Sequence, residues 1–306
     1  MRVFRGLPAV ADTPVALTIG NFDGVHRGHQ AMLGRLCEAA DDLGLASSVL
    51  TFEPHPREFF SPGSAPPRLC SLRAKLEAFS AHGVARTYVA RFDRALAGLA
   101  PDAFVESVLV RSLGARWVLV GEDFRFGKAR AGDVPALRTA ASTFSVEAMR
   151  TVAVDGQRIS SSAVRAALAA GDLARAAALL GRPYRLSGHV AHGAKLGRSL
   201  GYPTANIVLK GAVPLSGIFA VRVHGLGDVP RDGAASLGLR PTVEDRSIPL
   251  LEVFILDFDE AIYGRRIHVD FMHKLRDEAR FDNLDALRRQ IDTDVANARA
   301  FFSHGA

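Results

Sequence analysis

Two histidines, His26 and His29, stand in the glycine-rich segment GNFDGVHRGH, residues 20–29. Gly24 and Gly28 let the backbone turn tightly and let a ligand approach. A helical pattern starts near Gly28, which places His29 in the first turn of a helix, where free backbone N–H groups attract an anion. Two imidazoles there can donate hydrogen bonds to phosphate oxygens and stabilise charge developing on a triphosphate. The residue types therefore favour a phosphate site.

Two other interpretations of the histidine pair stay open at this point. A zinc site is disfavoured because no third ligand follows at a familiar spacing. The second alternative is a pair of solvated loop histidines without a chemical role.

A second glycine-bounded segment, GEDFRFG at residues 121–127, follows another apolar run. It nearly has the form of a Walker A loop, but five residues separate Gly121 from Gly127, and Ala129 stands where Ser or Thr is required. We reject the P-loop interpretation for these reasons. The segment is still expected at the same edge of the sheet as the histidines.

Three serines begin a helical pattern in DGQRISSSAVR, residues 155–165. One of them is expected to cap the helix. The three hydroxyls together with Arg158 and Arg165 also suit a phosphate. Three anion-binding segments at one sheet edge favour a nucleotide site.

The segment GHVAHGAKLGRSLGYPTAN, residues 188–206, carries a second set of polar groups. Its glycines with Lys195 and Arg198 resemble a loop that covers phosphates. Thr204 and Asn206 lie two residues apart, hence on one side of an extended segment, and their oxygens suit Mg²⁺. A turn in which the Asn side chain bonds its own backbone is an equally good interpretation.

Two histidines of the same segment, His189 and His192, do not form a metal pair in this interpretation. Positions three apart on a strand point to opposite faces, so structural roles are expected for both.

Glu252 lies within the apolar run LLEVFILDF, residues 250–258, on one predicted face with Phe254, Leu256 and Phe258. A carboxylate among apolar neighbours either protects a sheet edge or serves chemistry. A base for deprotonating an alcohol is the chemical interpretation.

The first half of the chain must supply the elements that position the histidines. Apolar, β-rich runs alternate with helical patterns, which predicts a parallel sheet with helices on both faces and ligands at the carboxyl ends of its strands, near the switch point. The predicted strands span 15–20, 46–52, 84–90, 116–121 and 144–152, and the predicted helices 28–43, 72–82, 101–113, 133–141 and 161–180.

The pattern changes near Gly181 and Pro183, which predicts domains at residues 1–182 and 183–306. Short strands separated by Gly/Pro-rich turns then predict a small antiparallel barrel. The predicted strands span 184–192, 217–224, 233–239, 250–258 and 266–272. A final amphipathic helix is expected to pack its apolar stripe into the core, and that stripe consists of Leu284, Leu287, Ile291, Val295 and Ala298.

Composition limits the function classes. With 306 residues, 48% of them hydrophobic and 23% charged, the chain can form two globular domains. A net charge of +6 suits anionic partners, yet no Lys/Arg run with interleaved aromatics is present. Nucleotides are therefore a sufficient explanation of the charge, and no nucleic-acid partner is expected.

No signal-peptide pattern and no apolar run of ~20 residues occurs, so we expect a cytoplasmic protein without a membrane partner. Cys37 and Cys70 are expected to be reduced thiols.

Four segments in this order, GNFDGVHRGH, TFEPHPREFF, GEDFRFG and ISSSAVR, closely resemble the bacterial bifunctional riboflavin kinase/FAD synthetase family. The second half is similar to the same family in GRSLGYPTAN, LGLRPT, LEVFILDF and LRDEARF. The resemblance implies an N-terminal Rossmann-like nucleotidyltransferase α/β domain and a C-terminal six-stranded antiparallel (Greek-key) riboflavin kinase barrel with a terminal helix.

In the N-terminal half, the resemblance implies that His26 and His29 bind phosphates and stabilise transfer of AMP from ATP to FMN. It also implies a set of ATP- and phosphate-binding residues, which are Gly20, Phe22, Asp23, Gly28, Asp123, Arg158, Ser161, Ser162 and Arg165. His55 and Pro56 match the flavin side of this site. Family members often have Thr at the place of Ser162 and vary between Asp and Asn at the place of Asp123.

In the C-terminal half, the resemblance implies that Thr204 and Asn206 hold Mg²⁺ with ATP, and that Lys195 and Arg198 contact its phosphates. Glu252 would activate the ribityl 5′-hydroxyl of riboflavin. Many members have Asn where this chain has Ser236.

The implied function is synthesis of FMN from riboflavin and ATP, followed by synthesis of FAD and pyrophosphate from FMN and a second ATP. The alternatives are an enzyme with one active half, and a flavin- or nucleotide-binding regulator without turnover. The expected partners are ATP, riboflavin and FMN, and the chain is expected to be a monomer or a weak homo-oligomer.

Overall fold

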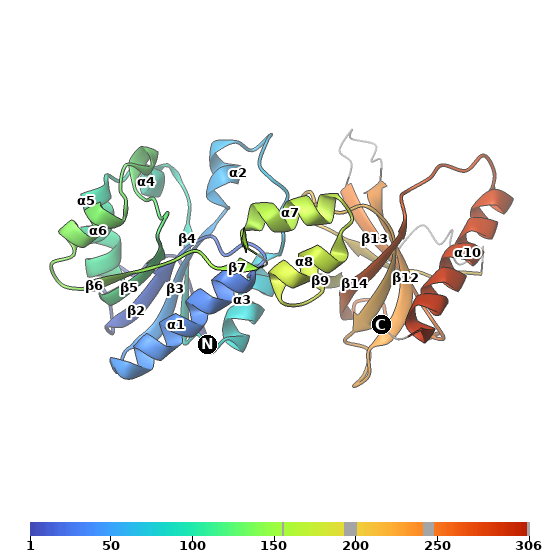
Figure 1. Cartoon of the computed structure of the whole chain (residues 1–306), viewed down its shortest axis with the longest axis horizontal. Helices are drawn as coiled ribbons and strands as arrows, with labels where there is room; N and C mark the ends of the chain where they lie inside the picture. The colour runs from blue at the N-terminus through green and yellow to red at the C-terminus, as the bar shows by residue number, and fades with distance from the viewer. Residues whose placement is uncertain (155, 193–200, 241–247, 305–306) are drawn as a thin grey trace. The chain divides into compact units, whose positions relative to one another are not determined.

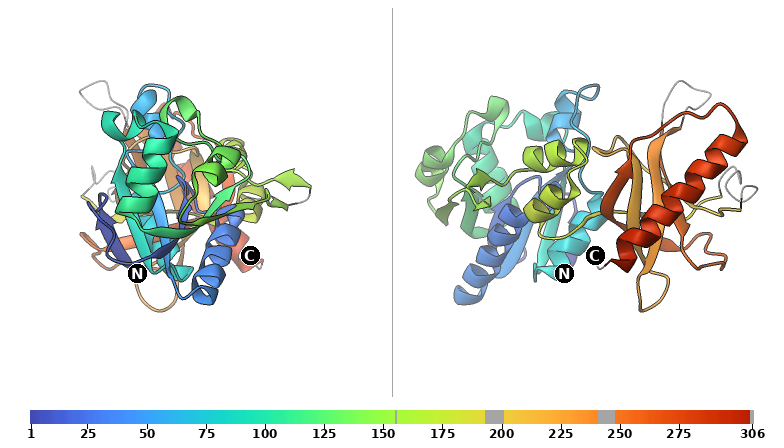
Figure 2. Two further views of the ribbon diagram at one scale, coloured as in Figure 1. Left: turned by 90° about the vertical axis from the view of Figure 1, so that its left-hand side faces the viewer. Right: turned by 45° about the vertical axis from the view of Figure 1, so that its right-hand side comes forward.

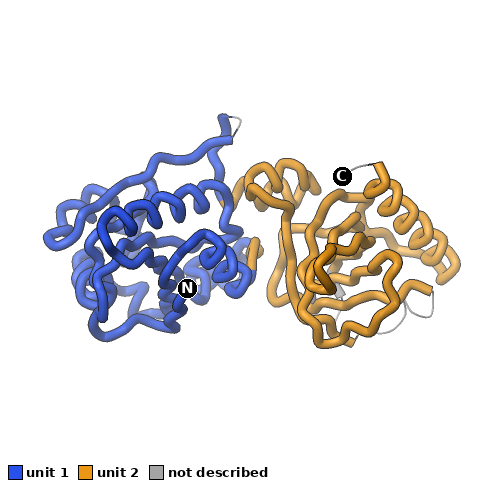
Figure 3. Tube along the Cα trace, turned by 90° about the horizontal axis from the view of Figure 1, so that it is seen from below, with its two compact units in different colours: residues 1–66, 71–160 blue, residues 67–70, 161–306 orange. Residues whose placement is uncertain are grey.

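The structure is a computed structural model that describes residues 1–154, 156–192, 201–240 and 248–304 (Figure 1). The chain forms two compact units (Figure 3). The first contains residues 1–66 and 71–160, and the second contains residues 67–70 and 161–306. The predicted domain boundary after residue 182 lies beyond two helices that belong to the second unit, and it stays a prediction.

The first unit is built on a six-stranded parallel sheet with the order β1-β4-β3-β2-β5-β6. Its strands are β1 Arg2–Arg5, β2 Val15–Ile19, β3 Ala46–Glu53, β4 Arg86–Arg91, β5 Ala115–Gly121 and β6 Ser145–Met149. From β2 the chain builds β3 and β4 on one side, and it then returns to place β5 and β6 on the other. The topological switch point therefore lies between β2 and β5.

Helices cover both faces of this sheet, as Figures 1 and 2 show. They are α1 Arg27–Asp42, α2 Pro56–Phe60, α3 Leu72–Ala81, α4 Arg94–Ala97, α5 Pro101–Phe104 with the π-helical segment Val105–Ser112, and α6 Val134–Ala140. One core joins α1 and α3 to side chains such as Ala16, Val49 and Leu119. A second core joins α5, the π-helical segment and α6 to the alternate side chains Leu17, Leu50 and Val118. Both faces are buried because successive side chains of each strand point to opposite sides.

The main segment of the second unit starts at Ser161 with two helices where the sequence predicted one. Helix α7 spans Ser161–Ala169 and α8 spans Leu173–Leu180. Gly171 separates them with a φ of +74°, in the left-handed region that favours glycine, and the Asp172 side chain caps α8 by accepting from the Arg175 N–H at 2.8 Å.

Six antiparallel strands form the predicted barrel, with the order β10-β13-β12-β11-β14-β9. They are β9 Tyr184–His189, β10 Ala205–Val208, β11 Gly217–His224, β12 Arg231–Arg240, β13 Ile248–Ile255 and β14 Arg266–Arg276. Strands β11, β12 and β13 pair consecutively and β14 returns beside β11, which is the Greek-key arrangement.

Close approach of β9 and β10 brings the two edge strands of the barrel together. The Ala191 N–H donates to the Asn206 carbonyl at 2.8 Å. A Cβ at Gly188 would lie 2.3 Å from the Ile207 side chain, so only glycine fits there.

Helix α10, Leu284–Ser303, packs on the barrel (Figure 2). The predicted core role of its apolar stripe is confirmed only in part. Ala298 is fully buried against Ala220 and Ala234, whereas Leu284 is exposed. Leu287 and Ile291 line a cavity between the helix and the barrel.

Candidate active sites

The turn from β2 into α1 is backbone-strained. Phe22 and Val25 have φ values of 49° and 43°, in the left-handed region that is rare for non-glycine residues. A Cβ at Gly28 would lie 3.3 Å from the His26 ring, so glycine lets that imidazole lie against the start of the helix. Strain of this kind is concentrated at functional sites.

His26 and His29 stack face to face within this turn. Their ring centroids lie 3.6 Å apart with an interplanar angle of 13°. His26 is the N-cap of α1, and its Nδ1 accepts from the His29 backbone N–H at 3.3 Å. Because Nδ1 is an acceptor, a neutral His26 carries its proton on Nε2. His26 is only 6% exposed, which excludes the solvated-loop interpretation.

Burial decides the charge of both rings. It lowers the pKa of His26 from 6.5 to about 4, although the charge of Asp23 acts in the opposite direction. Burial also lowers the pKa of His29 well below 6.5, assisted by the charges of His26 and Lys75. At neutral pH the two imidazoles are hydrogen-bonding groups without positive charge. In the described part of the chain, His29 Nδ1 is buried and has no hydrogen-bond partner.

A cleft of about 810 Å³ opens at the carboxyl edge of the sheet. Gly20 follows β2, Asp123 follows β5, and Pro56 begins α2, and all three line this cleft. Aromatic rings form much of its wall, contributed by Phe52, Phe60, Phe92, Phe104, Phe124 and Phe126. The cleft lies where the sequence placed a ligand, at the switch point of the sheet.

The adjacent residues His55 and Pro56 have different structural roles. His55 Nδ1 accepts from the Arg57 N–H at 3.1 Å, and the His55 N–H donates to Glu58 at 3.2 Å. His55 thereby caps α2 in a reciprocal capping box, while Pro56 lines the cleft.

Arg158 and Asp123 form an ion pair in the first unit. Arg158 lies on the short hairpin formed by β7, Ala153–Val154, and β8, Gln157–Arg158. Both side chains are exposed, and Asp123 lines the cleft. Two of the predicted phosphate-site residues are thus bonded to each other, because the Asp123 carboxylate holds the Arg158 guanidinium.

Ser161, Ser162 and Arg165 lie on α7 in the second unit. Arg165 Nε donates to the Pro67 carbonyl at 2.7 Å. Their predicted approach to the histidine pair stays a prediction.

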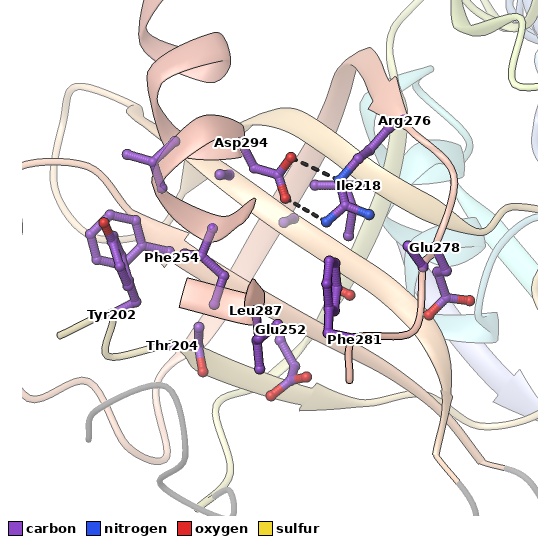
Figure 4. A pocket seen from close by; sticks show the side chains of 16 residues that line it. Tyr202, Thr204, Ile218, Glu252, Phe254, Arg276, Glu278, Phe281, Leu287 and Asp294 are labelled. Atoms are coloured by element: carbon purple, nitrogen blue, oxygen red, sulfur yellow. Dashed lines mark hydrogen bonds and ion pairs between the residues drawn. The ribbon is translucent and has the colours of Figure 1, made fainter. Parts of the chain in front are cut away.

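The barrel holds a second cavity, of about 270 Å³, between its strands and α10. Thr204, Ser236 and Glu252 are among its polar lining residues, beside the apolar side chains of Phe254 and Leu287. Figure 4 shows Thr204 and Glu252 near one end of the cavity, and an ion pair between Arg276 and Asp294 at the other.

Strand register places Glu252 between two polar neighbours. It pairs with Asn206 across β10 and β13, and with Ser236 across β12 and β13, so the three residues share one face. Glu252 and Phe254 share a face, as predicted, and that face lines the cavity. Leu256 and Phe258 lie beyond the end of β13 and do not extend this face.

The oxygens around Asn206 fit Mg²⁺. Asn206 is buried, and its Nδ2 donates to the Thr204 carbonyl at 3.0 Å. Its Oδ1 is buried without a hydrogen-bond partner among the described residues. An amide oxygen without a donor, a hydroxyl and a carboxylate form the hard-ligand set that Mg²⁺ prefers. Lys195 and Arg198 lie outside the described residues.

The histidines of the barrel segment have local contacts. His189 Nδ1 lies 3.0 Å from the Gly264 carbonyl, and the His192 ring stacks on Tyr263 with centroids 4.0 Å apart. No cluster of three or more metal-binding His, Cys, Asp or Glu side chains occurs among the described residues.

Sequence reasoning missed the Arg276–Asp294 pair. Arg276 donates to both carboxylate oxygens of Asp294, at 2.8 and 2.6 Å, and Gln290 donates to the same carboxylate at 3.0 Å. The available signal was the position of Asp294 on the inward stripe of the last helix, three residues after Ile291.

Comparison with known proteins matches each half of the chain to a family model. The family model described as FAD synthetase matches residues 9–163, and the model described as riboflavin kinase matches residues 180–302. Within the described ranges no helix is long and apolar enough to cross a membrane.

Bifunctional riboflavin kinase/FMN adenylyltransferases are similar over nearly the whole chain. The protein from Pseudomonas fluorescens is 49% identical, covering 94% of this chain and 93% of its own length. The protein from Haemophilus influenzae is 46% identical, covering 94% of each chain. A solved structure named macrolide-efflux protein from Streptococcus pneumoniae has a TM-score of 0.81 at 26% identity, covering 96% of this chain and 97% of its own.

The fold and function implied by the sequence motifs are therefore confirmed. Both activities are indicated, FAD synthetase by the first matched segment and riboflavin kinase by the second. The chain belongs to the family of bifunctional riboflavin kinase/FMN adenylyltransferases.

Proposed function

We propose that the β2–α1 turn binds the triphosphate of ATP for adenylyl transfer to FMN. His26 Nε2–H and the His29 ring donate to phosphate oxygens, and Asp23, Phe22 and Gly28 shape the turn. The free N–H groups at the start of α1 add a second set of donors. FMN phosphate is already an anionic nucleophile, so the site needs positioning and charge stabilisation rather than a base.

FMN occupies the aromatic-lined cleft in this proposal, with Pro56 and Gly20 in its wall and His55 capping the helix that carries Pro56. Arg158 exchanges its bond to Asp123 for a phosphate oxygen when substrate binds. Ser161, Ser162 and Arg165 supply further phosphate donors. The exposed Arg158–Asp123 pair supports this exchange, because an exposed ion pair costs little to open.

The barrel cavity binds riboflavin beside Glu252. Glu252 takes the proton of the ribityl 5′-hydroxyl, the hydroxyl oxygen bonds to the γ-phosphorus of ATP, and ADP leaves with the electron pair of the broken bond. Thr204 and Asn206 would hold Mg²⁺, which offsets phosphate charge when bound. Lys195 and Arg198 are proposed to contact the same phosphates. The partnerless Asn206 Oδ1, in register with Glu252, carries this assignment.

Other properties of the chain also remain proposals. These are a domain boundary near residue 182, a cytoplasmic location, and a monomer or weak homo-oligomer. The efflux activity in the name of the Streptococcus pneumoniae structure is not carried over, because both family models name flavin enzymes.

Separate assays of two variants test the assignment. His29→Ala should lower FAD formation from FMN and ATP by roughly 100-fold while FMN formation stays within twofold. Glu252→Ala should lower FMN formation by roughly 100-fold or more and leave FAD formation from supplied FMN intact. Equal loss of both activities in either variant would contradict two separate sites. FMN formation without FAD in the unmodified protein would instead indicate one inactive half.

A further inference from the structure

One buried charge in the first unit is unused by the proposed mechanism. Lys75 is only 5% exposed, and lysine is almost never fully buried unless it is paired. Among the residues that the structure describes, no hydrogen bond or ion pair is formed by its ammonium group. Within the described ranges, no carboxylate of the protein holds this ammonium group, so its charge is available to an anionic ligand.

The position of Lys75 relates it to the histidine pair. Lys75 and Phe79 are the two buried residues of α3 and lie one helical turn apart on the same face. The Phe79 ring contacts Phe22 at 5.2 Å between centroids, and Phe22 contacts His29 at 5.0 Å. The Lys75 charge is near enough to help lower the pKa of His29, after the larger effects of burial and of His26. Lys75 and His29 thus lie in the same part of the first unit, linked by Phe79 and Phe22.

Adenylyl transfer needs positive charge that the imidazoles do not supply. An ATP triphosphate carries several negative charges, and negative charge collects on the leaving pyrophosphate as the reaction proceeds. Neutral imidazoles donate hydrogen bonds but carry no charge. Arg158 is exposed and paired with Asp123. Lys75 supplies a positive charge that acts on His29.

We propose that Lys75 binds the ATP phosphates next to His29 and neutralises the departing pyrophosphate. This inference rests on the proposed phosphate site at His26 and His29. An oxygen of the FMN phosphate bonds to the α-phosphorus of ATP, and the bond from that phosphorus to the bridging α–β oxygen breaks. The pyrophosphate keeps the electron pair, no proton is transferred, and Lys75 stays protonated. In this proposal the triphosphate is the counter-ion of the Lys75 ammonium group.

Lys75→Met in the full chain tests this assignment, because methionine keeps the length of the side chain and removes the charge. FAD formation should fall by roughly 100-fold, and inhibition of FAD formation by added pyrophosphate should weaken. FMN formation by the barrel should stay within twofold. The ligand-free first unit should unfold at a similar urea concentration, since the substitution keeps the buried apolar stem and breaks no ion pair with a described residue. Lys75→Arg should restore part of the FAD activity.

Arg73→Met is the matched control, since Arg73 lies on the same helix, carries the same charge and is exposed. It should leave all these measurements unchanged. The inference is overturned if Lys75→Met keeps FAD formation within threefold, or if it loses activity with unchanged pyrophosphate inhibition. When His29→Ala lowers FAD formation and Lys75→Met does not, only this inference fails. When neither variant lowers it, the proposed phosphate site fails as well.

Discussion

His26 and His29 lie against each other at the start of α1, and neither ring is charged at neutral pH. The sequence indicated that histidines would meet an anion there, and a protonated pair would have been the simplest device. The structure favours a different one, because burial keeps both rings neutral. Hydrogen bonding and charge are divided between different side chains, with Lys75 as the cation.

The depressed pKa of His26 makes the stability of the first unit depend on pH. The unfolded chain binds a proton at His26 near pH 6.5, and the folded chain binds it only near pH 4. Stability is therefore complete above pH 6.5 and is lost as the pH falls towards 4, by up to about 3 kcal/mol from this residue.

His26→Asn should remove that part of the pH dependence, because Asn keeps a capping oxygen and does not titrate. Urea unfolding followed by fluorescence of Trp117, the single tryptophan, reports on the first unit. The loss of unfolding free energy between pH 6.5 and 4 should be about 3 kcal/mol smaller in the variant. The same pH profile in both proteins would contradict a neutral buried His26.

At the scale of elements, long periodic segments were predictable and short ones were not. The five predicted parallel strands and helices such as α1 and α3 agree with the structure, because each repeats its apolar pattern over enough residues. The elements β1, α2 and α4 were missed, since four or five residues carry no measurable period. The helix break at Gly171 was signalled by glycine followed by a capping Asp, which the apolar pattern on both sides obscured.

The contact of α10 with the barrel depends on the Arg276–Asp294 pair. Asp294 is 4% exposed, and removing one partner of a buried pair leaves the other uncompensated. Asp294→Leu should lower the free energy of unfolding of the barrel by about 3 kcal/mol, and the double variant Arg276→Met/Asp294→Leu should recover most of it. Far-UV circular dichroism in urea should show a shifted barrel transition, while Trp117 fluorescence stays unchanged.

Asp277→Asn serves as the control for that measurement, because Asp277 is exposed and its ion pair with Lys274 should contribute less than about 1 kcal/mol. A single Asp294→Leu variant as stable as the unmodified chain would show that the pair does not hold the helix.

At the scale of the molecule, each unit carries its own set of groups suited to a triphosphate. Sequence motifs predicted both sets because the chemistry restricts the residue types. The sequence could not reveal that Lys75 is buried, since a lysine in a helix gives the same pattern whether it is buried or solvated. The family resemblance implied that Thr204 and Glu252 serve one site, but the residue pattern alone could not place them in one cavity, because that depends on the pairing of β10 with β13.

Two separate sites predict two nucleotide equivalents per chain. Calorimetric titration with Mg²⁺ and a non-hydrolysable ATP analogue should saturate at two equivalents. His29→Ala and Asn206→Ala should each leave one binding event, and the double variant should leave none. Saturation at one equivalent, removed by either substitution alone, would contradict the two-site account.

Residues 67–70 belong to the second compact unit although the sequence on both sides of them belongs to the first. The Pro67 carbonyl accepts a hydrogen bond from Arg165, which lies far downstream in the chain. During synthesis on the ribosome, this tetrapeptide emerges long before α7 does. The loop that precedes it, whose residues Ser61, Ser64 and Pro66 line the cleft of the first unit, is therefore fixed at this end only late in synthesis. No single cut of the chain, or of its gene, can release both units intact.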